Sequence, residues 1–172
     1  RQENTVPEAL PEIAQPADLP SGPVLAALRA LPLHAPANPS ALLHGDYWPG
    51  NLLWQDGRLQ AVIDWEDASL GDPLIDLGIA RLETVWMFGP QALPLFTQAY
   101  AARNRPDFRA LPYWDLCAAL RLSRLVGSSL GEWANSFAAQ GRPDLTPPLL
   151  MGRFAWFVEQ ALAERVSLRR SA

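Results

Sequence analysis

A dense set of polar side chains lies between short apolar runs in the first half of the chain. The residues that packing explains least well are Asp46, Asn51, Asp64, Asp72 and Asp76. Any one loop aspartate is compatible with a turn or a helix cap. So many carboxylates within one short stretch point instead to a binding or catalytic site.

A predicted β-hairpin brings two of these side chains together. Residues 51–55 and 58–63 are typical of strands, and Asp56-Gly57 between them is a strong signal for a two-residue turn. A hairpin returns its far end beside its start, so Asp64 is expected within a few ångströms of Asn51. Oxygen ligands this close favour a hard divalent cation, and the softer ligands that zinc prefers are missing from the cluster. We therefore expect Asn51 and Asp64 to hold Mg²⁺.

Asp46 precedes Asn51 by five residues and need not touch the same cation. A loop carboxylate beside a metal-held phosphate is well placed to accept the proton of an attacking hydroxyl. Asp46 is therefore the candidate general base.

The order and spacing of these residues resemble the aminoglycoside phosphotransferase and choline kinase-like family. The matching motifs are His44-Gly45-Asp46 with Asn51 five positions after the aspartate, Ile63-Asp64-Trp65-Glu66, Gly71-Asp72-Pro73 and Asp76-Leu77. The resemblance is specific over residues 41–82 and looser through the remainder of the chain. These enzymes have a protein-kinase-like fold and transfer the γ-phosphoryl group of a nucleotide to a small-molecule hydroxyl or amine.

Carried over to this sequence, the resemblance implies that Asp46 is the catalytic base and that Asn51 and Asp64 bind magnesium at the phosphates of ATP or GTP. His44 would brace the catalytic loop. Asp76 would hold the same loop by hydrogen bonds, and Asp72 would act structurally at the start of a helix.

The elements that must position these residues predict an α+β chain. A lead-in over residues 1–40 contains one short helix, with Ser21 as its cap and residue 31 as its approximate end. Residues 41–172 resemble the mostly helical carboxy-terminal lobe of a kinase-like fold. Its expected parts are a catalytic loop (44–51), a hairpin (51–63), a metal loop (64–72) and a helical body (73–170).

Composition excludes several other classes of protein. The net charge of −4 argues against a nucleic-acid partner, and no run of eighteen apolar residues is present to span a bilayer. A single cysteine and two histidines permit neither a disulfide nor a structural zinc cluster. We therefore expect a cytoplasmic protein whose ligands are a nucleotide and a small-molecule acceptor.

The amino-terminal lobe of the family has no counterpart in this chain. That lobe carries a glycine-rich loop and a phosphate-pairing lysine, whereas the sequence contains no Gly-x-Gly and all fourteen basic residues are arginine. The chain also begins at Arg1, so we expect a piece of a longer polypeptide, with negligible activity by itself. The exposed surface near residues 41–63 is then expected to pair with the missing lobe or with a second copy.

Two other functions remain open at this point. One is a non-catalytic, kinase-like binding module, and the other is a metal-dependent phosphoesterase that activates water.

The acceptor is not fixed by the sequence. The acidic residues predicted on helices favour a cationic compound such as an aminoglycoside, an amino sugar or a choline-like molecule, and they are Glu83, Asp115, Glu132 and Glu159. Glu66 and Asp67 are interpreted as solvated or as supporting the metal site. Arg121 and Arg124 are interpreted as lining an exposed helix face, with contact to a phosphate or an anionic substrate as the alternative.

Overall fold

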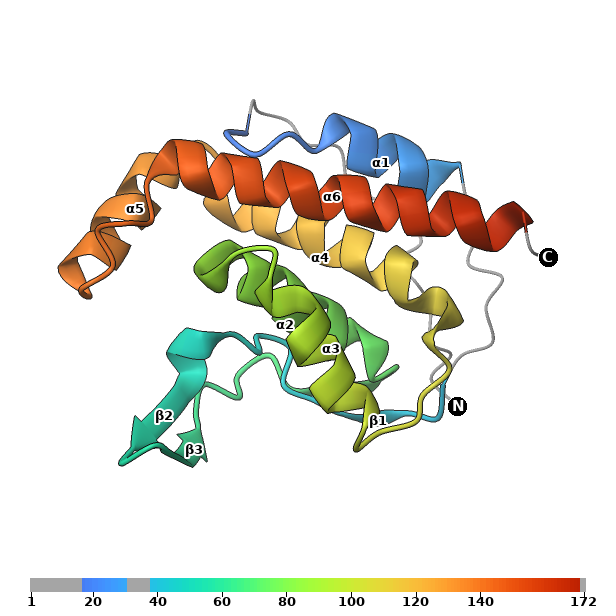
Figure 1. Cartoon of the computed structure of the whole chain (residues 1–172), viewed down its shortest axis with the longest axis horizontal. Coiled ribbons are helices and arrows are strands. Elements are labelled where there is room, and N and C mark those ends of the chain that lie inside the picture. The colour runs from blue at the N-terminus through green and yellow to red at the C-terminus, as the bar shows by residue number, and fades with distance from the viewer. Residues whose placement is uncertain (1–16, 31–37, 171–172) are drawn as a thin grey trace.

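The structure is a computed structural model, and it describes residues 17–30 and 38–170 of the chain. The elements, in chain order, are α1 (Gly22–Arg29), β1 (Ala41–Leu43), the 3₁₀ turn η1 (Pro49–Asn51), β2 (Leu52–Gln55), β3 (Arg58–Val62), β4 (Ser69–Gly71), α2 (Leu74–Phe88), α3 (Ala92–Ala101), the 3₁₀ turn η2 (Phe108–Ala110), α4 (Leu111–Val126), α5 (Leu130–Ala139) and α6 (Pro147–Arg170). Figure 1 shows the helices gathered into one body, with the β2–β3 hairpin projecting from a corner of it. This is the α+β, mostly helical class that the sequence predicts.

The helical body is built around α2, α4 and α6, which pack against one another (Figure 1). Trp86 of α2, Leu116 of α4 and Phe154 of α6 are each completely buried in the shared core. Burying a side chain of this size stabilises a fold by about 1.5–3 kcal/mol. Apolar residues at three- and four-residue spacing thus account for the body, as predicted.

The described part of the lead-in belongs to the same core. Leu19 and Val24 are fully buried, and the carboxylate of Asp18 accepts a hydrogen bond from the first backbone N–H of α5, that of Leu130 (3.0 Å). Ser21 stands at the amino end of α1 as predicted, but its side chain makes no capping hydrogen bond. Residues 1–16 and 31–37, including the expected helix end at residue 31, lie outside the described residues.

The predicted hairpin is present. Strands β2 and β3 pair antiparallel, with Gln55 opposite Arg58. The turn residues Asp56 and Gly57 both have positive φ, at 51° and 72°, as a tight two-residue turn that matches the strand twist requires. The first strand begins one residue later than predicted, because Asn51 belongs to the 3₁₀ turn η1.

A second strand pair was not predicted. Strand β4 lies at the end of the segment expected to be a metal loop only, and it pairs antiparallel with β1. Leu42 and Leu70 face each other across this pair, and both are largely exposed, at 66% and 75%. The β1–β4 pair therefore presents an apolar outer surface, and Trp54 and Leu59 of the hairpin are exposed as well.

An ion pair inside the helical body joins three helices. Arg81 of α2 donates hydrogen bonds from Nε and Nη2 to the carboxylate of Asp115 on α4, each at 3.0 Å, and from Nη1 to Thr97 of α3. Both charged side chains are almost completely buried. Burial raises the pKa of Asp115 to about 6 while Arg81 opposes the rise, so the carboxylate is ionised at neutral pH and needs its partner.

Replacing Arg81 by alanine is expected to lower the free energy of unfolding by about 3–5 kcal/mol, because it leaves a buried carboxylate without a counter-ion. Urea denaturation measures the change. Arg109→Ala is the matched control, since Arg109 pairs with Asp107 on the exposed surface and its loss should have little effect. Equal losses in the two variants would contradict a special role for the buried pair.

Candidate functional site

His44 connects the polar loop, residues 44–51, to the end of the hairpin. Its ring is buried, with Nε2 lying 2.8 Å from the carbonyl oxygen of Ile63 and Nδ1 lying 3.2 Å from the backbone nitrogen of Asp46. A carbonyl only accepts and a backbone amide only donates, so the ring is neutral with its proton on Nε2. One side chain therefore ties the residue before Asp64 to the backbone of Asp46.

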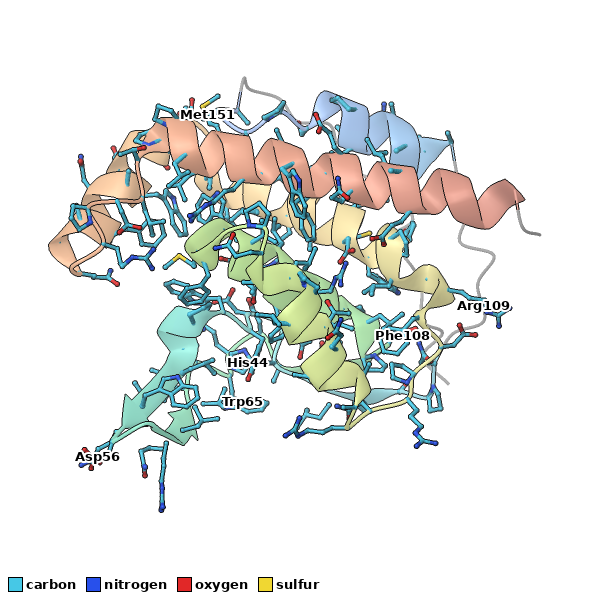
Figure 2. The ribbon with its side chains drawn as sticks, in the orientation of Figure 1. His44, Asp56, Trp65, Phe108, Arg109 and Met151 are labelled. Carbon is cyan, nitrogen blue, oxygen red and sulfur yellow. The ribbon has the colours of Figure 1, made fainter. Side chains whose placement is uncertain are left out.

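Two aromatic rings lie beside this histidine. The rings of Trp65 and His44 have centroids 4.6 Å apart, and Figure 2 shows the two side chains together between the hairpin and the helices. The Tyr47 ring meets His44 edge-on at 5.9 Å. These contacts limit the orientations that the imidazole can adopt.

Asp76, in the first turn of α2, fixes the start of the polar loop. Its Oδ2 accepts a hydrogen bond from the backbone N–H of His44 (2.6 Å), and its Oδ1 accepts one from that of Gly45 (2.9 Å). Gly45 has a φ of +83°, and a Cβ on it would come within 2.5 Å of the Asp67 carbonyl oxygen. The loop conformation thus requires the Asp76 carboxylate as an acceptor and glycine at position 45.

Asp46 is held through both oxygens of its carboxylate. Asn51 donates from Nδ2 to Asp46 Oδ2 (3.1 Å) and to the Asp46 carbonyl (3.0 Å). On the other side, Arg121 of α4 donates from Nη2 to Asp46 Oδ1 (2.8 Å). The side chains of Asp46 and Arg121 are each 29% exposed, so solvent and ligands still reach the pair.

Asp64 follows directly after the hairpin. The backbone N–H of Ile63 donates to the Asn51 carbonyl (3.0 Å), so the chain enters Asp64 beside the polar loop. Asp64 has a left-handed backbone conformation, with a φ of +67°, which is uncommon for a residue other than glycine. Its side chain is exposed, and within the described part of the chain no hydrogen bond engages its carboxylate.

The side-chain oxygen atoms of Asn51 and Asp64 fit a magnesium ion better than a softer metal. Because the amide nitrogen of Asn51 is turned toward Asp46, its amide oxygen is the atom left for a cation. Over residues 17–30 and 38–170 there is no group of three or more His, Cys, Asp or Glu side chains that would hold a metal by itself. Mg²⁺ commonly takes one or two protein oxygens and completes its shell with water and phosphate.

Asp72 lies apart from this network. Its carboxylate accepts hydrogen bonds from the backbone N–H (3.1 Å) and the amide of Asn38, and from the backbone N–H of Leu74 (2.9 Å). It therefore fastens the segment before β1 to the start of α2.

The contact between Arg121 and Asp46 differs from the sequence interpretation, which placed Arg121 on an exposed helix face. The two residues are 75 positions apart, and no local pattern links them. Asp67 also comes near, with its Oδ2 lying 3.8 Å from Arg121 Nη2.

The acidic residues expected to attract a cationic acceptor are not all at the surface. Asp115 is bound to Arg81, and Glu83 of α2 is buried, whereas Glu132 and Glu159 are exposed. Burial raises the pKa of Glu83 to about 8, Arg121 lowers it in part, and Asp46 raises it. Glu83 is therefore uncharged at neutral pH. The expectation that these four residues form an exposed acidic face is wrong for two of them, because Glu83 and Asp115 are buried.

No helix in the parts of the chain that the structure describes has the length and apolar character needed to cross a bilayer.

Comparison with known proteins gives a family match that includes the polar loop and the hairpin. The profile of the "Phosphotransferase enzyme family" matches residues 2–116. Homoserine kinase of Pseudomonas aeruginosa is 32% identical over 141 residues, covering 76% of this chain and 42% of that protein. Viomycin phosphotransferase of Streptomyces vinaceus is 47% identical over 57 residues, covering 31% of this chain and 18% of that protein.

Human acyl-CoA dehydrogenase family member 11 is 27% identical over 115 residues, which are 56% of this chain and 14% of that much longer protein. No solved structure gives a significant match. The chain thus spans less than half the length of each of these curated relatives.

Replacing Asp76 by asparagine is expected to lower the free energy of unfolding by about 1–3 kcal/mol, because the amide keeps only one acceptor for two partly buried N–H groups. Hydrogen exchange followed by NMR should show faster exchange at the amide of His44 or Gly45. Asp56→Asn at the hairpin turn is the control, since asparagine tolerates that positive φ. Unchanged exchange at both loop amides would rule out the anchoring role.

The raised pKa of Glu83 makes stability depend on pH. Because the folded-state pKa of about 8 exceeds the ordinary 4.5, this group's stabilisation is complete below pH 4.5 and is lost as the pH rises to 8. Relative to Glu83→Gln, the unmodified protein should lose about 3 kcal/mol of unfolding free energy between pH 6 and pH 9.

Urea denaturation at the two pH values measures this loss, with the exposed Glu132→Gln as control. If Glu83→Gln and the unmodified protein lose stability in parallel, Glu83 is not buried as an uncharged acid.

Proposed function

The chain belongs to the phosphotransferase enzyme family, and on that premise we propose that it carries the catalytic base and the metal ligands of an ATP-dependent small-molecule kinase. The relatives include two named small-molecule phosphotransferases, one for homoserine and one for viomycin. The observation that carries the proposal is the joining of Asp46, Asn51 and the residue before Asp64 by hydrogen bonds through His44 and Asn51.

In this proposal Asp46 accepts the proton of the acceptor hydroxyl as the oxygen attacks the γ-phosphorus. Asn51 and Asp64 hold Mg²⁺, which, when bound, neutralises charge on the phosphates of ATP or GTP. His44 and Asp76 keep the polar loop in place, so the base and the metal ligands stay in a fixed relation. Positioning of this kind supplies most of the catalysis in phosphoryl transfer.

The acceptor in this proposal is a small molecule with a free hydroxyl or amine. Homoserine kinase is the named kinase that covers the larger share of this chain, 76%, so a hydroxy amino acid is the first acceptor to test. Aminoglycoside-, sugar- and choline-like compounds are the other acceptors to test. The burial of Glu83 and Asp115 removes part of the earlier reason for preferring a cationic acceptor.

A further polypeptide is part of the proposal. Apolar side chains are exposed on both strand pairs, and they are Leu42, Leu53, Trp54, Leu59 and Leu70. Surfaces of this kind are usually covered by a partner. We propose a nucleotide-binding lobe or a second copy of the chain as that partner, and a cytoplasmic setting for the whole enzyme. Light scattering distinguishes the two, since only the second copy gives a dimer of the chain alone.

Metal binding tests the proposed site directly. Titration with Mn²⁺ as a magnesium substitute, followed by electron paramagnetic resonance in the presence of ATP, should give one site. Asn51→Ala and Asp64→Asn should each weaken it about tenfold or more, since even indirect ligand contacts contribute that much. Asp56→Asn at the hairpin turn is the matched control. Equal affinity in all four proteins would refute the metal site.

Phosphoryl transfer tests the reaction itself. The 172-residue chain with Mg²⁺ and ATP should turn over far below the ~1–100 s⁻¹ usual for kinases, because no lysine is present to pair with the phosphates. Any transfer that is detected should fall about 10²- to 10⁴-fold in Asp46→Asn.

A rate typical of kinases from the chain alone would contradict the expected inactivity. Phosphate release from simple esters without nucleotide would favour a phosphoesterase instead. Ligand binding with no transfer, even when a nucleotide lobe is supplied, would favour a non-catalytic module.

A further inference from the structure

Arg121 makes a contact that the proposed reaction does not require. Its guanidinium reaches from α4 to Asp46, the candidate base, through Nη2 alone. Of its five N–H donors, those on Nε and Nη1 make no hydrogen bond to the residues that the structure describes. Because 29% of the side chain is exposed, these donors are available to a ligand beside the base.

The two sides of Asp46 differ in character. Oδ2 faces Asn51 at the foot of the hairpin, where the phosphates and their cation are proposed to lie. Oδ1 faces Arg121 and the helical body. Phosphoryl transfer places the acceptor hydroxyl and the leaving phosphate in line on opposite sides of the γ-phosphorus. Because Oδ2 faces the proposed metal and phosphate side, the Oδ1 side, beside Arg121, is the one left for the acceptor in this scheme.

Among the residues that the structure describes, Asp46 alone accepts a hydrogen bond from the Arg121 guanidinium. The neighbouring acids do not account for the arginine, since Glu83 is uncharged at neutral pH and the exposed Asp67 is 3.8 Å away. The positive charge of Arg121 is thus opposed mainly by Asp46 itself.

We propose that Arg121 is the specificity-determining residue for the acceptor, and that it binds a carboxylate group on that molecule. This inference rests on the proposed function and names the substrate class for the same site. A planar guanidinium pairs with a carboxylate through two parallel hydrogen bonds, a geometry that a hydroxyl or an ammonium group of the acceptor does not offer. The acceptor is then a hydroxy acid or a hydroxy amino acid.

Binding of such an acceptor also prepares the base. The acceptor's carboxylate replaces Asp46 as the partner of the guanidinium, which leaves Asp46 Oδ1 open to the acceptor hydroxyl. In the transfer step the hydroxyl proton moves to Asp46, and the acceptor oxygen forms a bond to the γ-phosphorus. The bond from the γ-phosphorus to the β–γ bridging oxygen breaks, and its electron pair leaves with ADP.

NMR of the Arg121 Nε–H group tests the inference in the unmodified 172-residue chain. The probes are L-homoserine and 3-aminopropan-1-ol, which share the hydroxyl and the ammonium group and differ in the carboxylate. L-Homoserine should shift the Arg121 resonance in a saturable way, and 3-aminopropan-1-ol should leave it unchanged. In Arg121→Gln the affinity for L-homoserine should fall about tenfold or more. Arg103→Gln, which changes an exposed arginine in the turn after α3, should bind normally.

Each other outcome overturns the inference. Equal shifts with both probes, or none with either, mean that Arg121 does not read a carboxylate. A shift with MgATP but not with L-homoserine assigns Arg121 to the nucleotide phosphates. The Mn²⁺ titration reports separately on Asn51 and Asp64, so intact metal binding with no response at Arg121 refutes this inference alone, whereas lost metal binding refutes the proposed function.

Discussion

The geometry of the site depends on the hydrogen bonds that the carboxylate of Asp76 accepts. This carboxylate accepts two backbone hydrogen bonds from the first residues of the polar loop, so the loop is fixed to α2, a largely buried helix of the body. The His44 ring in turn makes hydrogen bonds to the backbone of Asp46 and to the carbonyl of Ile63 at the end of the hairpin, so both are held relative to the loop. Hydrogen bonds to a charged acceptor are among the stronger ones, and here they stabilise a loop conformation that also requires Gly45.

Charge at the site is balanced by few groups. Asp46 is bound by the neutral amide of Asn51 on one side and by the cationic Arg121 on the other. Burial raises the pKa of Glu83 to about 8, and the positive charge of Arg121 lowers it only in part, so Glu83 is protonated at neutral pH. The site thus carries fewer negative charges at neutral pH than its sequence indicates.

The parts of the structure that local rules decide could be predicted from the sequence. The turn at Asp56-Gly57 needs two positive φ angles, and residues of this type adopt them readily, so the hairpin could be predicted. The register shift between Leu53 and Trp54 could not. Apolar periodicity was sufficient for the helical body. Strand β4 was missed, because its three residues, Ser69–Gly71, are exposed at two positions and pair only with β1, far away in the chain.

The electrostatic details of the site could not be predicted in this way. The pairing of Arg121 with Asp46 depends on how α4 packs under the polar loop, and the neutral state of Glu83 depends on burial, which composition does not reveal. The resemblance to a family supplied the identities of the candidate base and ligands, but it did not supply Arg121. Contacts between distant elements thus set the charges around the candidate base, whereas local motifs identify the candidate base and the candidate metal ligands.

The most direct measurement of the central claim is anomalous diffraction from crystals of the chain grown with Mn²⁺ and a non-hydrolysable ATP analogue. We expect a single strong peak between the Asn51 amide oxygen and the Asp64 carboxylate, with Asp46 facing the same space. A peak at other residues, or ordered nucleotide with Asn51 and Asp64 turned apart and no metal between them, would contradict it.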